Sequence, residues 1–190
     1  MGDIGHITVE QEVMGLGAAT FLGSLGSDGR ILWEFQLNDP FGDEDDLTLL
    51  TLNGLELGDA RHPVELDRTR VNSEQMPMDL GEHGFFFDGF CEGLSSLRLG
   101  VKSWRSADQR LLVSGDGCLD DGRRFEFAAA CEFQGVRVVG DTRASVMDQV
   151  RAIWQVEEVS RKLDLRWSEV DGGRIACAVY FADKPPGEPS

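Results

Sequence analysis

Residues 110–133 read RLLVSGDGCLDDGRRFEFAAACEF, and this segment contains the clearest pattern for a β-rich fold. The Asp-Asp-Gly sequence at 120–122 predicts a hairpin turn, because glycine accepts a positive φ without steric cost and aspartate bonds its own backbone. After the turn, apolar and polar residues alternate, and one face collects Phe125, Phe127, Ala129, Cys131 and Phe133. This period of two predicts a strand with one buried face, which is typical of antiparallel sheets.

Similar turn sequences recur along the chain. Asp and Gly stand between apolar segments at 26–30 and at 171–174, and Asn53-Gly54 separates 47–52 from 55–57. We interpret each of them as a hairpin turn. Further strands are predicted at 5–13, 18–25, 30–37, 84–92, 96–104 and 110–119. Many short strands at hairpin spacing predict an antiparallel β-sandwich or an open barrel.

One helix is predicted, from about residue 142 to about residue 161. An apolar stripe recurs there at three- and four-residue spacing, and Asp141 or Thr142 is suited to cap its start. We expect this helix to cover one face or one edge of the sheet, ahead of a C-terminal hairpin. The segment 58–82 is expected to be mostly loop, with a short strand at 64–67. The predicted fold class is therefore mainly β with one helix in the C-terminal half (α+β).

The length of 190 residues favours a single β-rich domain, which we place at residues 1–182. The polar, proline-rich tail at 183–190 is expected to be disordered. Four cysteines occur without a Cys-x-x-Cys pair, which favours free thiols in a reducing compartment. The first residues lack a cationic and apolar leader pattern, so we expect the chain to be cytoplasmic.

The charge balance is the most unusual feature of the composition. Lysine and arginine number 18 against 34 acidic residues, so the formal net charge is −16. Such a charge repels nucleic-acid phosphates and anionic lipid headgroups, which argues against nucleic-acid and membrane partners. It is compatible with a basic protein partner.

An acidic segment is the first candidate site, and it contains Asp39, Asp43, Glu44, Asp45 and Asp46. Three interpretations remain open for these carboxylates: a solvated turn, a contact with a basic protein, or a cation site. Their spacing does not match the Asp-x-Asp-x-Asp-Gly loop of an EF-hand, so we predict no metal site. We take the five residues as the candidate partner-binding surface.

An aromatic segment at 85–90 is the second candidate, and Phe85, Phe87 and Phe90 are suited to line an apolar pocket. The alternative is a strand that is buried on both faces. The three histidines do not share a metal-ligand spacing; His83, beside Glu82, is a candidate general base or an exposed loop residue. Serine-hydrolase and phosphate-loop motifs are absent from the sequence, so no catalytic residue and no cofactor is predicted.

Three functional hypotheses follow from these observations. The first is an acidic, cytoplasmic binding module that neutralises or holds a basic partner, such as an immunity or inhibitor protein against a toxin-like effector. The second is a small-molecule-binding barrel, or an enzyme whose site shows no known motif. The third is a structural or assembly component that associates through strand edges or tryptophans.

Overall fold

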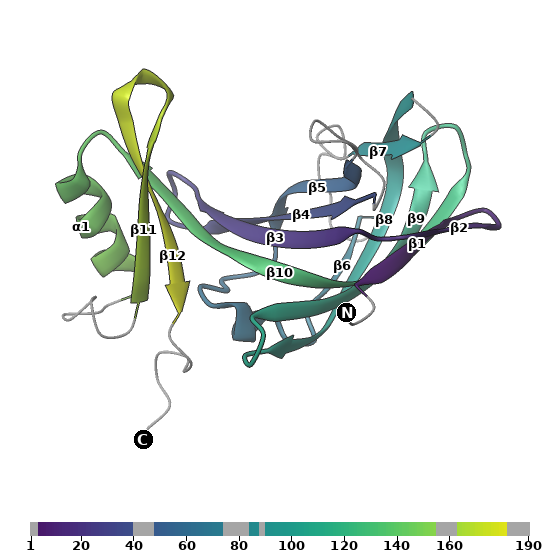
Figure 1. The fold of residues 1–190 in the computed structure, drawn as a ribbon, viewed down its shortest axis with the longest axis horizontal. Helices are drawn as coiled ribbons and strands as arrows, with labels where there is room; N and C mark the ends of the chain where they lie inside the picture. The colour runs from purple at the N-terminus through teal and green to yellow at the C-terminus, as the bar shows by residue number, and fades with distance from the viewer. Residues whose placement is uncertain (1–3, 40–47, 74–83, 88–89, 155–162, 182–190) are drawn as a thin grey trace.

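A twelve-stranded sheet curls into a half-barrel and carries a C-terminal hairpin and one helix (Figure 1). The computed structural model describes residues 4–39, 48–73, 84–87, 90–154 and 163–181. The strands are β1 (Gly5–Val9), β2 (Glu12–Gly15), β3 (Ala18–Leu25), β4 (Ile31–Asn38), β5 (Thr48–Glu56), β6 (Arg70–Asn72), β7 (Gly84–Phe87), β8 (Phe90–Arg105), β9 (Arg110–Leu119), β10 (Arg124–Gly140), β11 (Leu163–Val170) and β12 (Arg174–Phe181). The main path through the sheet is β11-β12-β10-β3-β4-β5-β7-β8-β6, β9 pairs with both β8 and β10, and β1 joins β2 to β10.

The hairpin of β9 and β10 confirms the prediction for residues 110–133. Arg124 lies opposite Cys118, and the turn between them contains Gly122 at a φ of 89°. β10 then continues beyond the end of its pairing with β9. β3 pairs with β10 from Glu132 onward, and after Gly135, which has a φ of 91°, β12 replaces β9 as the partner. The β3–β10 pair is parallel, whereas the other pairs recorded between the described strands are antiparallel.

Two predicted strands are each divided into a hairpin. The prediction of one strand at 5–13 is wrong, because Glu10 adopts a φ of 54° and turns the chain between β1 and β2. The prediction of one strand at 84–92 is also wrong, because β7 and β8 pair with each other from Phe87 opposite Phe90. The continuous apolar pattern of this segment concealed the reversal, because a buried hairpin and a buried strand have the same composition.

The predicted hairpin turn at Asn53-Gly54 is wrong in a different way. β5 runs through both residues from Thr48 to Glu56. Gly54 has a φ of 62°, and the register against β4 shifts at this point, between Trp33 and Phe35. Asn-Gly thus supplies the left-handed glycine of a β-bulge, which inserts one extra residue into the strand without reversing the chain.

The helix α1 (Arg143–Trp154) begins where the sequence predicts it. The Oγ1 atom of Thr142 accepts a hydrogen bond from the backbone N–H of Ser145 at 3.1 Å, so Thr142 caps the helix. The rest of the predicted helix, 155–161, lies outside the described residues. Figure 1 shows α1 beside β11 and β12, the hairpin predicted for the C-terminus. The tail at 183–190 also lies outside the described residues.

The segment between β5 and β6 contains a 3-10 helix, η1 (Pro63–Leu66), where a short strand was predicted. His62 precedes it, and its Nδ1 atom accepts a hydrogen bond from the N–H of Val64 at 3.1 Å. Proline at the first position favours a helical turn, because its φ is already fixed and its missing N–H is not needed there.

The core lies inside the curl of the sheet. The ring of Phe21 on β3 has aromatic neighbours on three other strands: Phe35 on β4, Phe133 on β10 and Trp104 on β8, with centroids 5.7, 5.1 and 6.1 Å away. Rings from strands far apart in the sequence therefore meet in one cluster. Their contact holds the sheet in its curled form, because separation would expose large apolar surfaces to water.

Candidate functional site

The two predicted sites are only partly covered by the structure. Asp39 follows the end of β4 and is half-buried, whereas Asp43, Glu44, Asp45 and Asp46 lie outside the described residues. The backbones of Phe85 and Phe87 belong to β7, and that of Phe90 begins β8. The side chains of these three phenylalanines lie outside the described part, so the predicted apolar pocket stays a prediction.

The strand pairing nevertheless shows where the acidic segment is attached. Asn38 and Thr48, which flank residues 39–47, pair with each other, and the start of β5 lies next to the end of β7. Because β7 and β8 pair from Phe87 opposite Phe90, segment 88–89 is attached at the same end of the sheet. The β9–β10 turn lies at this end as well, because Leu119 is opposite Leu94 near the start of β8. The β1–β2 turn lies beside it, because Val9 is opposite Phe125.

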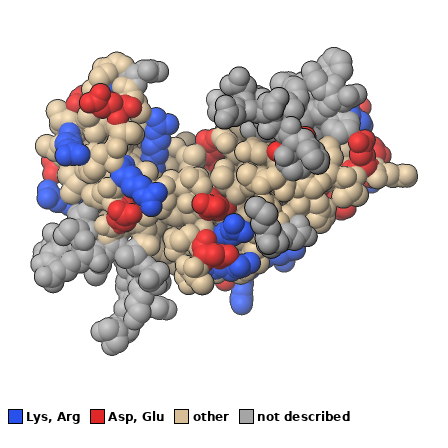
Figure 2. All heavy atoms as spheres, in the orientation of Figure 1, with Lys and Arg blue, Asp and Glu red and all other residues tan. Residues whose placement is uncertain are grey.

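We call this end of the sheet the acidic end. Its acidic residues in described segments are Glu10, Glu12, Asp39, Glu92, Asp120 and Asp121, and the attached segments contribute Asp43, Glu44, Asp45, Asp46 and Asp88. Its basic residues are Arg123 and Arg124. Figure 2 shows acidic side chains at the right-hand end of the molecule, near the position of β2 in Figure 1.

The opposite end of the sheet is nearly balanced in charge. The turn between β3 and β4, the turn between β8 and β9, and the segment 57–69 lie there. Their acidic residues and those of the adjoining strand ends are Asp28, Glu56, Asp59, Glu65, Asp67 and Asp108, and their basic residues are Arg30, Arg61, Arg68, Arg105 and Arg110. Several of these pair with each other, as Arg30 does with Glu56 at 3.0 Å.

The net charge is also unevenly divided between the described residues and the rest. The described residues contain 21 acidic and 15 basic side chains. The six remaining segments contain 13 acidic and 3 basic side chains in only 40 residues. Most of the negative charge therefore belongs to these segments rather than to the described strands and helix.

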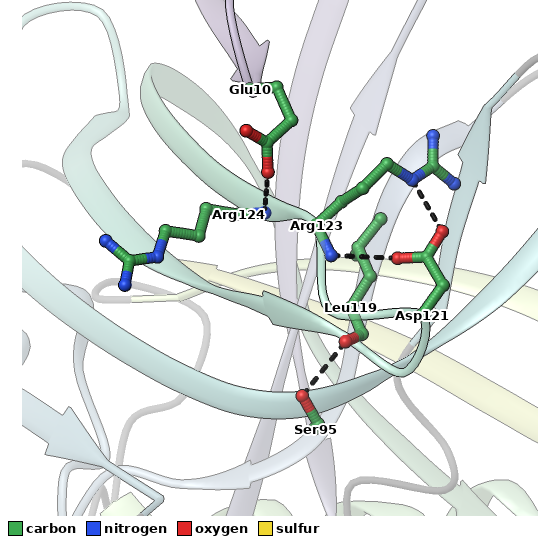
Figure 3. A network of polar contacts seen from close by, with 6 residues as sticks. All are labelled: Glu10, Ser95, Leu119, Asp121, Arg123 and Arg124. Atoms are coloured by element: carbon green, nitrogen blue, oxygen red, sulfur yellow. Dashed lines mark hydrogen bonds and ion pairs between the residues drawn. The ribbon is translucent and has the colours of Figure 1, made fainter.

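A polar network orders the turns of the acidic end (Figure 3). The backbone N–H of Arg124 donates to the carboxylate of Glu10 at 2.8 Å, which joins the β9–β10 turn to the β1–β2 turn. The hydroxyl of Ser95 on β8 donates to the carbonyl oxygen of Leu119 at 3.0 Å, which connects β8 to the β9–β10 turn. Within the turn, the N–H of Arg123 donates to Asp121 at 2.9 Å and lowers the pKa of that carboxyl.

A second feature is a polar hollow on the outer face of β1, β6, β8, β9 and β10, which we call the outer trough. Its volume is about 1260 Å³. Gly100, Ser114 and Ala128 lie in register across its floor, and His6 lies at the β1 side. At the β6 side it is lined by the basic residues Arg68, Arg70, Arg98 and Lys102. Sequence reasoning missed this site, because its residues come from strands far apart in the chain.

Asp116 and Glu126 form the acidic part of the outer trough, on β9 and β10. They lie opposite each other in the register, and the carboxylate of Asp116 forms a salt bridge with the guanidinium of Arg98 at 2.7 Å. The trough thus has a basic half over β6 and β8 and an acidic half over β9 and β10. A two-signed surface of this kind selects ligands by the arrangement of their charges.

The described histidine and cysteine side chains inside the fold are poorly suited to catalysis. His62 is 3% exposed, and burial lowers the pKa of its imidazole to about 4, so the ring is neutral near pH 7. Cys131 and Cys177 are free, and burial raises the pKa of their thiols to about 12 and about 11. Buried thiols remain protonated and are inert as nucleophiles. The candidate base His83 lies outside the described residues.

Among the described residues, no group of three or more His, Cys, Asp or Glu side chains is arranged to hold a metal ion. The described part of the chain also contains no helix of the length and apolarity needed to cross a membrane. Comparison with protein-family models, with curated proteins and with solved structures finds no match to this chain.

Proposed function

We propose that the chain is an acidic protein-binding module that holds or neutralises a basic protein, in the manner of an immunity or inhibitor protein. The single observation behind the proposal is the gathering of acidic turns at one end of the sheet, against a balanced opposite end. Basic surfaces such as those of nuclease-type toxins hold phosphate, and an acidic surface of matching shape competes for them.

The rigid attachment of this end supports the proposal. Glu10 and Arg124 exchange two hydrogen bonds, because the N–H of Glu10 also donates to the carbonyl oxygen of Arg124 at 2.9 Å. The N–H of Asp120 donates to the carbonyl oxygen of Gly93 at 3.0 Å and joins the same turn to β8. Surfaces that are ordered before binding lose less conformational entropy when the partner arrives.

The described chemistry also favours binding over catalysis. The thiols of Cys131 and Cys177 and the imidazole of His62 lie in the core and are unavailable to a substrate. Free thiols suit a reducing compartment, and in this proposal the chain meets its partner in the cytoplasm.

The experiment is a charge reversal of Asp43, Glu44, Asp45 and Asp46 to lysine, followed by capture of partners from a native lysate of the producing cells. The wild-type chain should retain a protein with a basic isoelectric point, released as the salt concentration rises. The reversed variant should lose that protein, because like charges at the contact slow association and weaken binding.

The matched control reverses four exposed acidic residues elsewhere, namely Asp59, Asp148, Asp164 and Glu169. It changes the net charge by the same amount, so it should keep the partner if the acidic end makes the contact. Equal loss in both variants would show an effect of net charge alone. Retention of no basic protein by the wild-type chain, or a closed oligomer in light scattering without any partner, would contradict the proposal.

A further inference from the structure

Three basic side chains surround Gly100 on the outer face of β8. Arg98 and Lys102 lie on the same face as Gly100, because the residues between them, Leu99 and Val101, are 2% and 4% exposed and point into the core. Arg70 on β6 is directly opposite Gly100 in the register. Strand geometry places these three positions roughly 5 to 7 Å from Gly100.

The centre of this group is open. Gly100 has no side chain, and on its other side it faces Ser114 of β9, whose hydroxyl is a hydrogen-bond donor. A Cβ atom added at Gly100 would have only the carbonyl oxygen of Ser114 within 4 Å, at 3.7 Å. The register of β8 shifts between Val101 and Ser103, so Lys102 is the extra residue of a bulge, and it lines the trough.

Two of the three cations have no counter-charge in the described structure. Arg98 contacts Asp116 at 2.7 Å. Arg70 and Lys102 have no acidic side chain within 4.0 Å among the residues that the structure describes. Unneutralised cations around an open floor stand out in a chain with a net charge of −16.

We propose that the Gly100 site, formed by Arg70, Arg98, Gly100, Lys102 and Ser114, binds a carboxylate of an extended acidic peptide segment that lies in the outer trough. Guanidinium groups bind carboxylates through paired, charge-assisted hydrogen bonds. The trough, at about 1260 Å³, is larger than the usual pocket for a small molecule, and its lining residues come from five neighbouring strands.

The acidic half of the trough decides between a peptide and a nucleic acid. Asp116 and Glu126 lie within two strands of the Gly100 site, and they repel a ligand that carries one negative charge at every repeat. A peptide can place an isolated carboxylate at the basic half of the trough and uncharged residues at the acidic half, so it avoids this repulsion. The Gly100 site is independent of the proposed contact between the acidic end and a basic protein.

The test is a nuclear magnetic resonance titration of the ¹⁵N-labelled full chain with a capped peptide, Gly-Gly-Glu-Gly-Glu-Gly-Gly. Saturable shifts are expected at the backbone amides of Gly100 and Ser114, with weaker binding as sodium chloride rises from low to physiological concentration. The same peptide with glutamine in place of glutamate should give shifts smaller by about tenfold at equal concentration.

Two variants test the geometry, and one serves as the control. Arg70→Gln removes an unpaired cation, and Gly100→Val fills the centre with a side chain that the backbone accepts; each should weaken binding about tenfold. Arg137→Gln removes an exposed charge on β10, outside the trough, and should leave the affinity unchanged. Unchanged shifts outside the trough show that each variant keeps its fold.

Four results would overturn the inference. The first is the absence of shifts at Gly100 and Ser114 at millimolar peptide, and the second is equal weakening by Arg137→Gln. The third is tighter binding of a single-stranded oligonucleotide than of the peptide at the same site. Self-association that Gly100→Val abolishes would assign this face to a second copy of the chain and would likewise reject the peptide.

Discussion

Buried His62 makes the free energy of unfolding fall as the pH falls below neutrality. The imidazole is 3% exposed, its Nδ1 atom accepts the N–H of Val64, and its Nε2 atom has no hydrogen-bond partner among the residues that the structure describes. The ring packs against Phe181, with centroids 4.2 Å apart. Protonation would remove the acceptor at Nδ1 and place a charge in the core, so burial lowers the pKa from 6.5 to about 4.

The magnitude follows from the two pKa values. Above pH 6.5 the ring is neutral in both the folded and the unfolded chain, and it contributes no pH dependence. Between pH 6.5 and pH 4 the unfolded chain binds a proton that the folded chain does not, so stability falls as the pH falls. At pH 5 the loss amounts to about 2 kcal/mol relative to pH 8.

The measurement is urea unfolding of the wild-type chain and of His62→Asn between pH 8 and pH 5. The amide oxygen of asparagine accepts the N–H of Val64 as the imidazole does, and asparagine does not titrate. Carboxylates, including the neighbouring Glu65, contribute equally to both proteins. The wild type should therefore lose about 2 kcal/mol more than the variant over this range. Equal losses in the two proteins would refute the reasoning.

Three further outcomes are expected. Gly115→Ala should destabilise the fold by about 1 to 3 kcal/mol in urea unfolding, because the added Cβ would lie 2.5 Å from the ring of Phe127. Gly100→Ala should change the free energy of unfolding by less than about 0.5 kcal/mol. Equal effects of the two substitutions would contradict the packing argument. Iodoacetamide at pH 8 should spare Cys131 and modify half-buried Cys118 in the native chain, as peptide mass mapping would show; prompt modification of Cys131 would contradict its burial. Thr142→Ala should cost about 1 kcal/mol by loss of the helix cap, and no loss of thermal stability would show that the cap is dispensable.

Local sequence patterns were sufficient for much of the fold. The turn at 120–122, the alternation that follows it and the start of α1 at Thr142 are all confirmed. Each of them depends on interactions between residues near each other in the chain: a glycine at positive φ, a period of two, or a hydroxyl that caps a helix. The predicted contact of the acidic residues with a partner stays a prediction.

The sequence alone determined the mainly β class, the single helix, the C-terminal hairpin and the charge of −16. Three features depend on the pairing of distant strands: Asn53-Gly54 forms a bulge, β10 pairs in parallel with β3, and Arg70 lies opposite Gly100. The physical reason is that a glycine at positive φ serves a turn and a bulge equally well, so the pairing of distant strands selects between them. The same long-range pairing assembles the Gly100 site and the acidic end from residues that no local pattern connects.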